Sequence, residues 1–283
     1  MSIAASQPKM FNQNCEVTFM EVEFHGVRGS IPVASEKFLG YGGNTTCIEI
    51  ISKDFQLIID AGSGFKDVSI REEVPSFLLF SHFHHDHLQG LAFNSAMFSK
   101  NHQVHISSGL VTGKRLKEVL STAFMPPLFP LDLVSDNPTF NIMNFETFQA
   151  AAVDFFSVET FTLSHPGGAI GYKITADKSS IVCGLDHEYG INEKLDSNFL
   201  DKADNSDLVV WDGMFTHLEL RDKYGWGHSS IEQGIDFSSS AKCKLLLITH
   251  HSPQREDYEL NKLAQELFPP NVRFAKENEK IKI

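Results

Sequence analysis

Short apolar runs separated by polar turns recur along the whole chain, and most of them predict β-strands. The first is EVTFMEVEF at 16–24, which alternates roughly and is rich in Val and Phe. The runs at 46–51 and 55–60 follow, and the turn-prone SKD between them predicts a hairpin. SFLLF at 76–80 predicts a short apolar strand that leads directly into a histidine-rich turn.

The second half of the chain repeats this style. Five further strands are expected, at 155–163, 169–175, 179–184, 207–211 and 244–249. Three segments predict helices, at 111–124, 229–241 and 255–267. No repeat of fixed period, low-complexity linker or break in composition divides the chain. We therefore expect one α+β domain over residues 16–283, preceded by a polar tail at 1–15, with sheets inside and helices outside.

Composition and charge narrow the classes of partner. Hydrophobic residues make up 42% of the chain and charged residues 21%, which is ordinary for a globular protein. The formal net charge of −12 argues against a long nucleic acid as partner, because proteins that bind one usually carry a basic stripe. The four cysteines form no CxxC pair and are expected to be free thiols. Without a signal peptide or a membrane-spanning run, a cytoplasmic protein with no membrane partner is expected.

A cluster of metal-binding side chains follows the strand at 76–80. His82, His84, Asp86 and His87 form the pattern H-x-H-x-D-H within FSHFHHDHLQG. The chain leaves the sheet here, so these side chains are able to turn toward one point. The first two would reach one ion and the last two a second ion beside it. Imidazole and carboxylate suit Zn²⁺, and also Mn²⁺ or Fe²⁺. The alternative is a histidine-rich surface loop.

Histidine and aspartate residues also follow three later predicted strands. His165 lies in FTLSHPGG, Asp186 in SSIVCGLDHE, and His250 and His251 in KLLLITHHSP. A single histidine at the end of a strand is more often structural than a ligand. Recurrence after three strands favours a site that holds two metal ions.

These motifs resemble those of the metallo-β-lactamase superfamily, and the similarity extends from about residue 24 to residue 257. The segments that are similar to its phosphodiesterase branch are HGVRGSIPV, YGGNTTCIEI, IIDAGSG, SHPGGAIGYKI, WGHSS and THHSP. That branch includes ribonuclease Z and the phosphoribosyl cyclic phosphodiesterases. The resemblance implies a four-layer αββα sandwich with two divalent metal ions at one edge.

The resemblance also implies a role for each ligand. His82, His84 and His165 would hold the first ion, Asp86, His87 and His250 the second, and Asp186 would bridge both. We prefer His250 to His251 because it directly follows LLIT, at the position of the family ligand. Asp60 in IIDAG resembles an aspartate that orients a ligand histidine. Its alternative role is that of a turn or cap carboxylate.

WGHSS resembles the G-H-S-T motif of the phosphodiesterase branch, in which the histidine contacts the scissile phosphate. His228 is therefore expected to act in catalysis, together with the metal-binding Asp86. The alternative is that Ser229 or Ser230 caps the helix that follows and His228 merely precedes it. Both readings are compatible, because a helix N-terminus also favours phosphate.

Four further residues are candidates for contact with the substrate or the metals. Arg28, Asn44 and His251 are expected to touch substrate, although turn-forming roles suit the first two equally well. His187 follows the predicted bridging aspartate, where relatives more often carry threonine. It would alter substrate contact or metal preference, or it would pack in the interior.

The expected reaction is hydrolysis of a phosphodiester. Two divalent ions would share a water molecule and lower its pKa, so that hydroxide attacks phosphorus. The Gly- and Lys-rich arm with which ribonuclease Z holds transfer RNA has no counterpart between His87 and His165 or between Asp186 and His228. We therefore expect a small substrate, such as a cyclic nucleotide or a cyclic sugar phosphate.

The sequence leaves several alternatives open. The same metal centre would support RNA processing of the ribonuclease Z type, or acyl hydrolysis of a lactam, lactone or thioester. A redox diiron protein and a non-catalytic nucleic-acid-binding module are further alternatives, although the first usually places a carboxylate where His84 stands. Whether the protein is a monomer or a homodimer also stays open.

Overall fold

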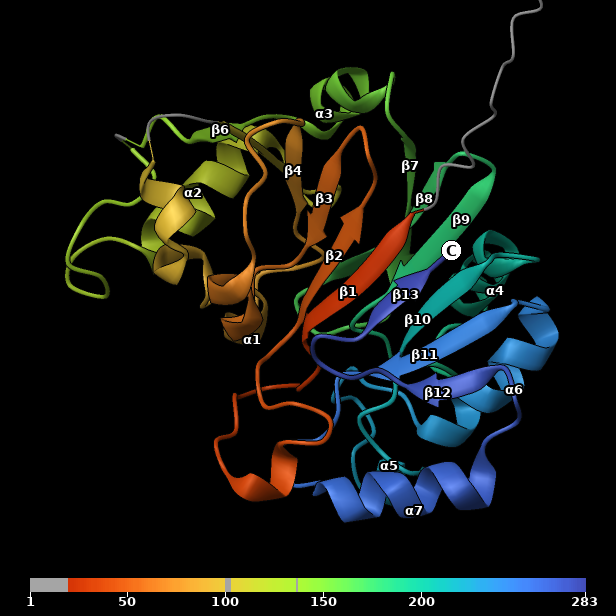
Figure 1. Cartoon of the computed structure of the whole chain (residues 1–283). Coiled ribbons are helices and arrows are strands. Elements are labelled where there is room, and N and C mark those ends of the chain that lie inside the picture. The colour runs from red at the N-terminus through yellow and green to blue at the C-terminus, as the bar shows by residue number, and fades with distance from the viewer. Residues whose placement is uncertain (1–19, 100–102, 136) are drawn as a thin grey trace, which may run out of the picture.

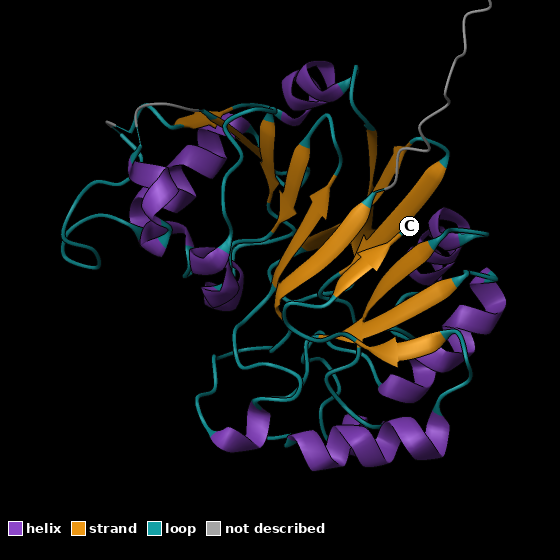
Figure 2. Cartoon of the chain, in the orientation of Figure 1, coloured by secondary structure: helices purple, strands orange, loops and turns teal. Residues whose placement is uncertain are grey.

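The computed structural model describes residues 20–99, 103–135 and 137–283. Two β-sheets lie face to face, and helices cover their outer faces (Figure 1; Figure 2). The predicted polar tail and the first residues of the strand expected at 16–24 lie outside the described residues. The described part is a mixed α+β structure, and the expectation of a four-layer αββα sandwich is confirmed.

The first sheet has seven strands in the order β13-β1-β2-β3-β4-β5-β6. They are β1 (Glu21–Gly26), β2 (Cys47–Ile51), β3 (Gln56–Ile59), β4 (Ser76–Leu79), β5 (Val104–Ser107), β6 (Phe140–Ile142) and β13 (Lys280–Lys282). Strands β2 and β3 pair antiparallel, which confirms the predicted hairpin. Strands β3, β4, β5 and β6 run parallel to one another, so their carboxyl ends meet at one edge of the sheet.

The second sheet has six strands in the order β12-β11-β10-β9-β8-β7. They are β7 (Ser157–Leu163), β8 (Ala169–Ala176), β9 (Ser179–Gly184), β10 (Leu208–Asp212), β11 (Leu245–Thr249) and β12 (Val272–Phe274). Strands β9 to β12 are parallel, whereas β7 and β8 form an antiparallel hairpin. The loops after β9, β10 and β11 therefore leave the same edge of the sheet.

Seven α-helices and four 3₁₀ helices connect the strands in the described residues. The α-helices are α1 (His85–Leu88), α2 (Gly113–Ala123), α3 (Phe145–Ala152), α4 (Glu193–Ala203), α5 (His217–Leu220), α6 (Ile231–Ala241) and α7 (Asp257–Leu267). The 3₁₀ helices are η1 (Glu36–Phe38), η2 (Ser63–Asp67), η3 (Leu91–Phe93) and η4 (Ser95–Phe98). Among the described residues, no helix combines the length and apolar character that crossing a membrane requires.

The main core lies between the two sheets and is formed by strand side chains that point inward. Phe24 and Ile50 of the first sheet share one buried cluster with Tyr172 and Val210 of the second, whereas the glutamates of β1 point to the outer face. A second cluster joins α4, α6 and α7 to the outer face of the second sheet. A third joins α2 and η3 to the outer face of the first sheet. The packed sheets thus form a rigid base for the loops at their common edge.

Candidate metal centre

The loops at this edge bring together the seven side chains that were predicted as metal ligands. A first cluster consists of His82, His84 and His165, and a second cluster consists of Asp86, His87, Asp186 and His250. In each cluster, one nitrogen or oxygen atom per residue lies within 4.8 Å of every other. The predicted convergence of these distant residues is therefore present in the fold. The second cluster contains His250 and not His251, and the role of His250 as a ligand stays a prediction.

The first cluster brings nitrogen atoms of its imidazoles toward one point. His165 donates from Nδ1 to the carbonyl of Gly227 at 2.8 Å, so that its Nε2 carries a lone pair. This Nε2 lies 3.0 Å from Nδ1 of His84. Burial lowers the pKa of both imidazoles below the ordinary value. Two neutral imidazoles whose nitrogens face each other at this distance suit a shared cation when His84 carries its proton on Nε2.

Asp186 lies between the two clusters. Its Oδ2 atom is 3.3 Å from Nε2 of both His87 and His250, and 3.6 Å from Nε2 of His82. Asp86 approaches the same point, with Oδ2 at 3.2 Å from Nε2 of His250. The backbone N–H of Ser30 donates to that oxygen at 2.7 Å and fixes its direction. A carboxylate in the position of Asp186 is able to contact cations on both sides.

The residues present fit a metal centre. Nε2 of His82, Nε2 of His87 and Oδ1 of Asp186 are buried and have no hydrogen-bond partner among the described residues. Leaving such atoms unpaired costs about 1–3 kcal/mol each, and coordination would remove this cost. Imidazole and carboxylate donors of this kind suit Zn²⁺, Mn²⁺ or Fe²⁺. The ligand roles, the identity of the ion and the number of ions stay predictions.

Asp60 supports the second cluster from behind. Its Oδ2 accepts a hydrogen bond from Nδ1 of His87 at 2.8 Å, and its Oδ1 accepts one from the N–H of Ser81 at 2.8 Å. The side chain is fully buried at the end of β3. Because Asp60 holds the Nδ1 proton of His87, Nε2 of this ring is left to face the cluster. This geometry agrees with the orienting role that was expected.

His228 lies at the same centre and pairs with a residue that the sequence analysis missed. Its Nδ1 is 2.8 Å from Oδ2 of Asp212, which ends β10 and is buried. Burial opposes protonation of the ring, but Asp212, Asp186 and Asp86 outweigh it and raise the pKa of His228 to about 9. The signal for Asp212 was present, since it follows an apolar strand just as Asp186 does.

Ser230 provides the predicted helix cap next to His228. It forms a capping box with Gln233 at the start of α6. Ser229 instead donates from its hydroxyl to the carbonyl of His187, which directly follows Asp186. The capping alternative and the proximity of His228 to the cluster therefore hold together, as the sequence allowed.

A pocket of about 400 Å³ opens over the centre. Its lining residues are Ser30, Phe83, His84, His85, Asp86, Asp186 and His228. Phe83 is the one large apolar side chain in this set. No lysine or arginine belongs to it, so positive charge in the lining comes from histidine and from any bound cation.

Arg28 corrects one prediction, because the structure places it away from this pocket. The side chain is fully buried, with Nε donating to the carbonyl of Gly42 at 2.7 Å and Nη1 donating to that of Arg255 at 2.8 Å. Its Nη2 lies 3.5 Å from Asp257. The expected contact with substrate is wrong, and Arg28 instead ties the 29–43 loop to the segment before α7.

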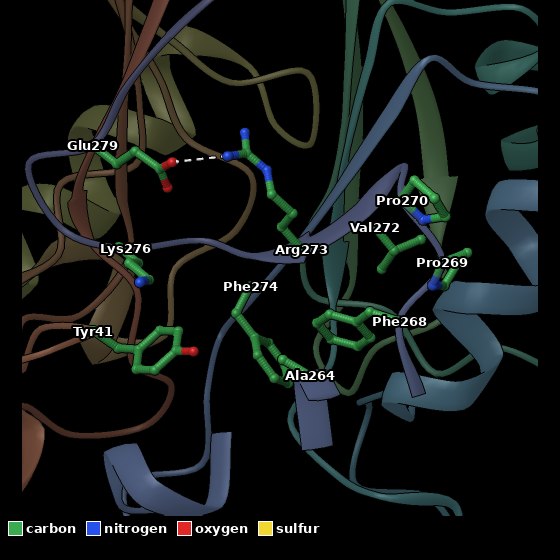
Figure 3. Close-up of a pocket in the computed structure, with 10 residues that line it drawn as sticks. All are labelled: Tyr41, Ala264, Phe268, Pro269, Pro270, Val272, Arg273, Phe274, Lys276 and Glu279. Carbon is green, nitrogen blue, oxygen red and sulfur yellow. Dashed lines mark hydrogen bonds and ion pairs between the residues drawn. The ribbon is translucent and has the colours of Figure 1, made fainter. Parts of the chain in front are cut away.

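His251 corrects a second prediction. It is fully buried, and its Nε2 donates to the carbonyl of Ala275 at 3.0 Å. Its ring packs edge-on against Tyr41 and Phe274, which line a separate pocket of about 360 Å³ (Figure 3). Burial and nearby Arg28 lower the pKa of His251 to about 3. A neutral ring in the interior is unable to contact substrate at the metal centre.

The side chains of Asn44 and His187 bond other parts of the protein instead of facing the pocket over the centre. The amide of Asn44 donates to Glu277 at 3.2 Å and accepts from Ser63 at 3.2 Å, and it does not line the pocket over the centre. His187 is buried, with Nε2 at 2.8 Å from Asp196 and Nδ1 accepting from the N–H of Ser164. The interior-packing alternative for His187 is therefore the one observed.

Three of the four cysteines are buried in the described part of the chain. Cys47, Cys183 and Cys243 are free thiols, and no disulfide joins them. Burial raises the pKa of Cys183 and Cys47 well above the ordinary value, so these thiols stay protonated. Cys15 lies outside the described residues.

Comparison with known proteins adds a family and several relatives. The family model described as "Beta-lactamase superfamily domain" matches residues 56–251, more than two thirds of the chain. Ribonuclease Z of Enterococcus faecalis is 30% identical over 89 residues, and that of Saccharolobus solfataricus is 32% identical over 74. These alignments cover 30% and 26% of this chain, and only 28% and 25% of the relatives.

Solved structures with the same fold cover almost the whole chain. The metallo-β-lactamase fold protein YhfI of Bacillus subtilis aligns with a TM-score of 0.71 at 20% identity, over 94% of this chain and 99% of its own. The short form of human tRNase Z aligns with a TM-score of 0.64 at 16% identity, over 92% of this chain and 98% of its own. A diphosphatase from the PhnP family aligns with a TM-score of 0.64 at 14% identity, over 93% of this chain and 98% of its own. At these identities the likeness shows the fold alone.

Proposed function

The chain belongs to the β-lactamase superfamily, and we propose that it is a metal-dependent hydrolase that cleaves a small phosphodiester. One observation carries this proposal. The two clusters of ligand atoms meet at Asp186, and His228 lines the same pocket with Asp212 behind it. A pair of cation sites beside a hydrogen-bond donor suits phosphoryl transfer, in which negative charge develops on the oxygens around phosphorus.

The residues of the chain divide the work between cation binding and charge neutralisation. Two divalent cations at such a centre would supply Lewis acidity and lower the pKa of a bound water. Asp60 and the carbonyl of Gly227 hold the protons of His87 and His165 on the nitrogens that face away from the centre. The protonated ring of His228, held through Nδ1 by Asp212, is free to donate from Nε2 to a phosphoryl or leaving-group oxygen.

The size and charge of the pocket favour a small substrate. A volume of about 400 Å³ suits one nucleotide or sugar phosphate, and Phe83 provides an apolar wall. The net charge of −12 and the absence of lysine and arginine from the lining argue against a long RNA. The curated relatives are ribonucleases, which supports a phosphodiester bond as target rather than an amide, ester or thioester.

A panel assay with defined metal content tests the proposal. The substrates are 2′,3′- and 3′,5′-cyclic nucleotides, a cyclic ribose phosphate, an aryl phosphodiester, a lactone and a precursor RNA. We expect the metal-loaded protein to hydrolyse a small phosphodiester fastest, and the metal-free protein to be inactive on all of them. A higher kcat/KM for the precursor RNA would replace the substrate class, and a higher kcat/KM for the lactone would replace the reaction.

A further inference from the structure

We infer that Glu188 is a positioning residue for the metal centre, acting through the loop at 225–227. For its effect on catalysis, this inference rests on the proposed function. Glu188 is 4% exposed, although carboxylates are seldom buried without strong partners. Its Oε1 accepts from the N–H of Gly225 and its Oε2 from the N–H of Gly227, both at 2.7 Å. Bonds of this length to an ionised acceptor are roughly twice as strong as neutral ones.

The two hydrogen bonds from Gly225 and Gly227 to Glu188 form a clamp on this loop, and Gly227 connects the clamp to the first cluster. The Gly227 carbonyl accepts the Nδ1 proton of His165 at 2.8 Å, which leaves Nε2 of that ring facing His84. Gly227 has a φ of 88°, and a Cβ atom on it would lie 2.1 Å from Nδ1 of His165. The carbonyl is therefore close to the ring because the position is glycine and because Glu188 holds the adjacent N–H.

The same loop continues into His228. Residue 228 follows Gly227 directly, so a shift of the loop displaces its imidazole relative to Asp212. A further hydrogen bond joins the segment after Glu188 to the segment after His228, since the N–H of Tyr189 donates to Oγ of Ser229 at 3.1 Å. On the other side, the N–H of Glu188 donates to the carbonyl of Ser164, next to His165, at 2.8 Å. Glu188 thus bonds the backbone directly before His165 and directly before His228.

Replacing Glu188 should loosen the centre without removing a ligand. In Glu188→Gln the amide keeps one acceptor, but its NH₂ group faces the second backbone N–H. Removing the partner of a ligand histidine typically costs 10- to 100-fold in metal affinity. We expect the affinity for the metal ion whose binding is weakened most to fall by about this factor. We also expect kcat to fall about 10-fold or more, with KM within about 3-fold of the wild-type value.

Asp196→Asn is the matched control. Asp196 is also a buried carboxylate, and it accepts from the N–H of Gly190 at 2.9 Å and from His187 at 2.8 Å, but it does not contact the 225–227 loop. It should lower the melting temperature to a similar extent while leaving metal affinity within about 3-fold of wild type. Glu188→Asp, which keeps the charge but reaches less far, should lie between wild type and Glu188→Gln and serves if the latter fails to fold.

The decisive measurement is a titration of the metal-free proteins with Co²⁺, followed by its absorption spectrum, with melting temperatures recorded in parallel. It needs no substrate, so it judges Glu188 even if the wild-type protein hydrolyses no phosphodiester and the proposed function fails. Wild-type affinity and an unchanged Co²⁺ spectrum in both Glu188 variants would overturn the inference. So would equal losses of affinity in Asp196→Asn and Glu188→Gln.

Discussion

Nδ1 of His228 lies 2.8 Å from Oδ2 of Asp212, and both side chains are buried next to Asp186. The carboxylate at the end of β10 therefore does for His228 what Asp60 at the end of β3 does for His87. In both cases a strand-end aspartate accepts a hydrogen bond from Nδ1 of the imidazole and so leaves Nε2 available for another partner. The two sheets contribute one such pair each.

Asp212→Asn should lower kcat on a small phosphodiester by about 100-fold, with a smaller effect on KM. The amide removes the charge that keeps His228 protonated, and it is able to hold the ring in the wrong tautomer. Steady-state kinetics on an aryl phosphodiester measures the loss. Asp207→Asn is the control, because Asp207 precedes β10 at its opposite end and pairs with Lys244 at 2.6 Å. Equal kinetics of the two variants would remove His228 and Asp212 from the mechanism.

Metal removal should destabilise the protein as well as inactivate it. A ligand present at 100 times its Kd stabilises the folded state by about 2.7 kcal/mol. We therefore expect chelation to lower the melting temperature by several degrees and readdition of Zn²⁺ or Mn²⁺ to restore it. Elemental analysis should give about two ions per wild-type chain and fewer in Asp186→Asn, since Asp186 contacts both clusters. An unchanged metal content in Asp186→Asn would argue against a bridging role.

The long, alternating strands were the predictable part of the fold. The runs at 155–163 and 169–175 correspond to β7 and β8, because β7 alternates between exposed and buried positions and β8 is buried along most of its length. By contrast, β6 and β12 have three residues each, too few for a pattern to show. Helix α4 was missed, although Asp196, Phe199 and Ala203 are buried at helical spacing along its length.

The convergence of the seven side chains at the centre was predictable because all of them follow strands that end at one edge of the fold. Asp212 would have followed from the same rule had strand-end carboxylates been considered throughout. Arg28 was assigned wrongly because its motif reaches the centre through Ser30 but says nothing about which way the arginine side chain points. Its acceptors at Gly42 and Arg255 are distant in the chain, so only the fold reveals them.

Arg28→Met should destabilise the protein and leave KM unchanged. The substitution leaves two buried carbonyls and Asp257 without their donor, at a cost of about 3 kcal/mol in the free energy of unfolding. Denaturant unfolding measures this loss. Arg71→Met is the control, because Arg71 is partly exposed and bonds the carbonyl of Ser52 and Glu73, so it should cost less. A raised KM at unchanged stability would restore Arg28 as a substrate contact.

Trp226 offers a way to tell nucleotides from sugar phosphates as substrates. It lies two residues before His228, its side chain is 56% exposed, and the ammonium group of Lys223 is 4.1 Å from its ring centroid. Glycines at positive φ flank it on both sides, and Glu188 accepts hydrogen bonds from their N–H groups, so the backbone of Trp226 is held in place two residues before His228. An exposed indole at a fixed place is suited to stacking on a nucleobase.

Trp226→Ala should therefore raise KM for a cyclic nucleotide by about 5- to 150-fold, because stacking on one base contributes roughly 1–3 kcal/mol. It should leave KM for a cyclic ribose phosphate unchanged, since that substrate has no base. Comparing kcat and KM on the two substrates measures the difference. Tyr258→Ala provides the control, because Tyr258 is 65% exposed on α7 and is not next to His228 in the chain. An equal change on both substrates would mean that Trp226 acts on the loop rather than on a base, and the cyclic sugar phosphate would then become the better candidate.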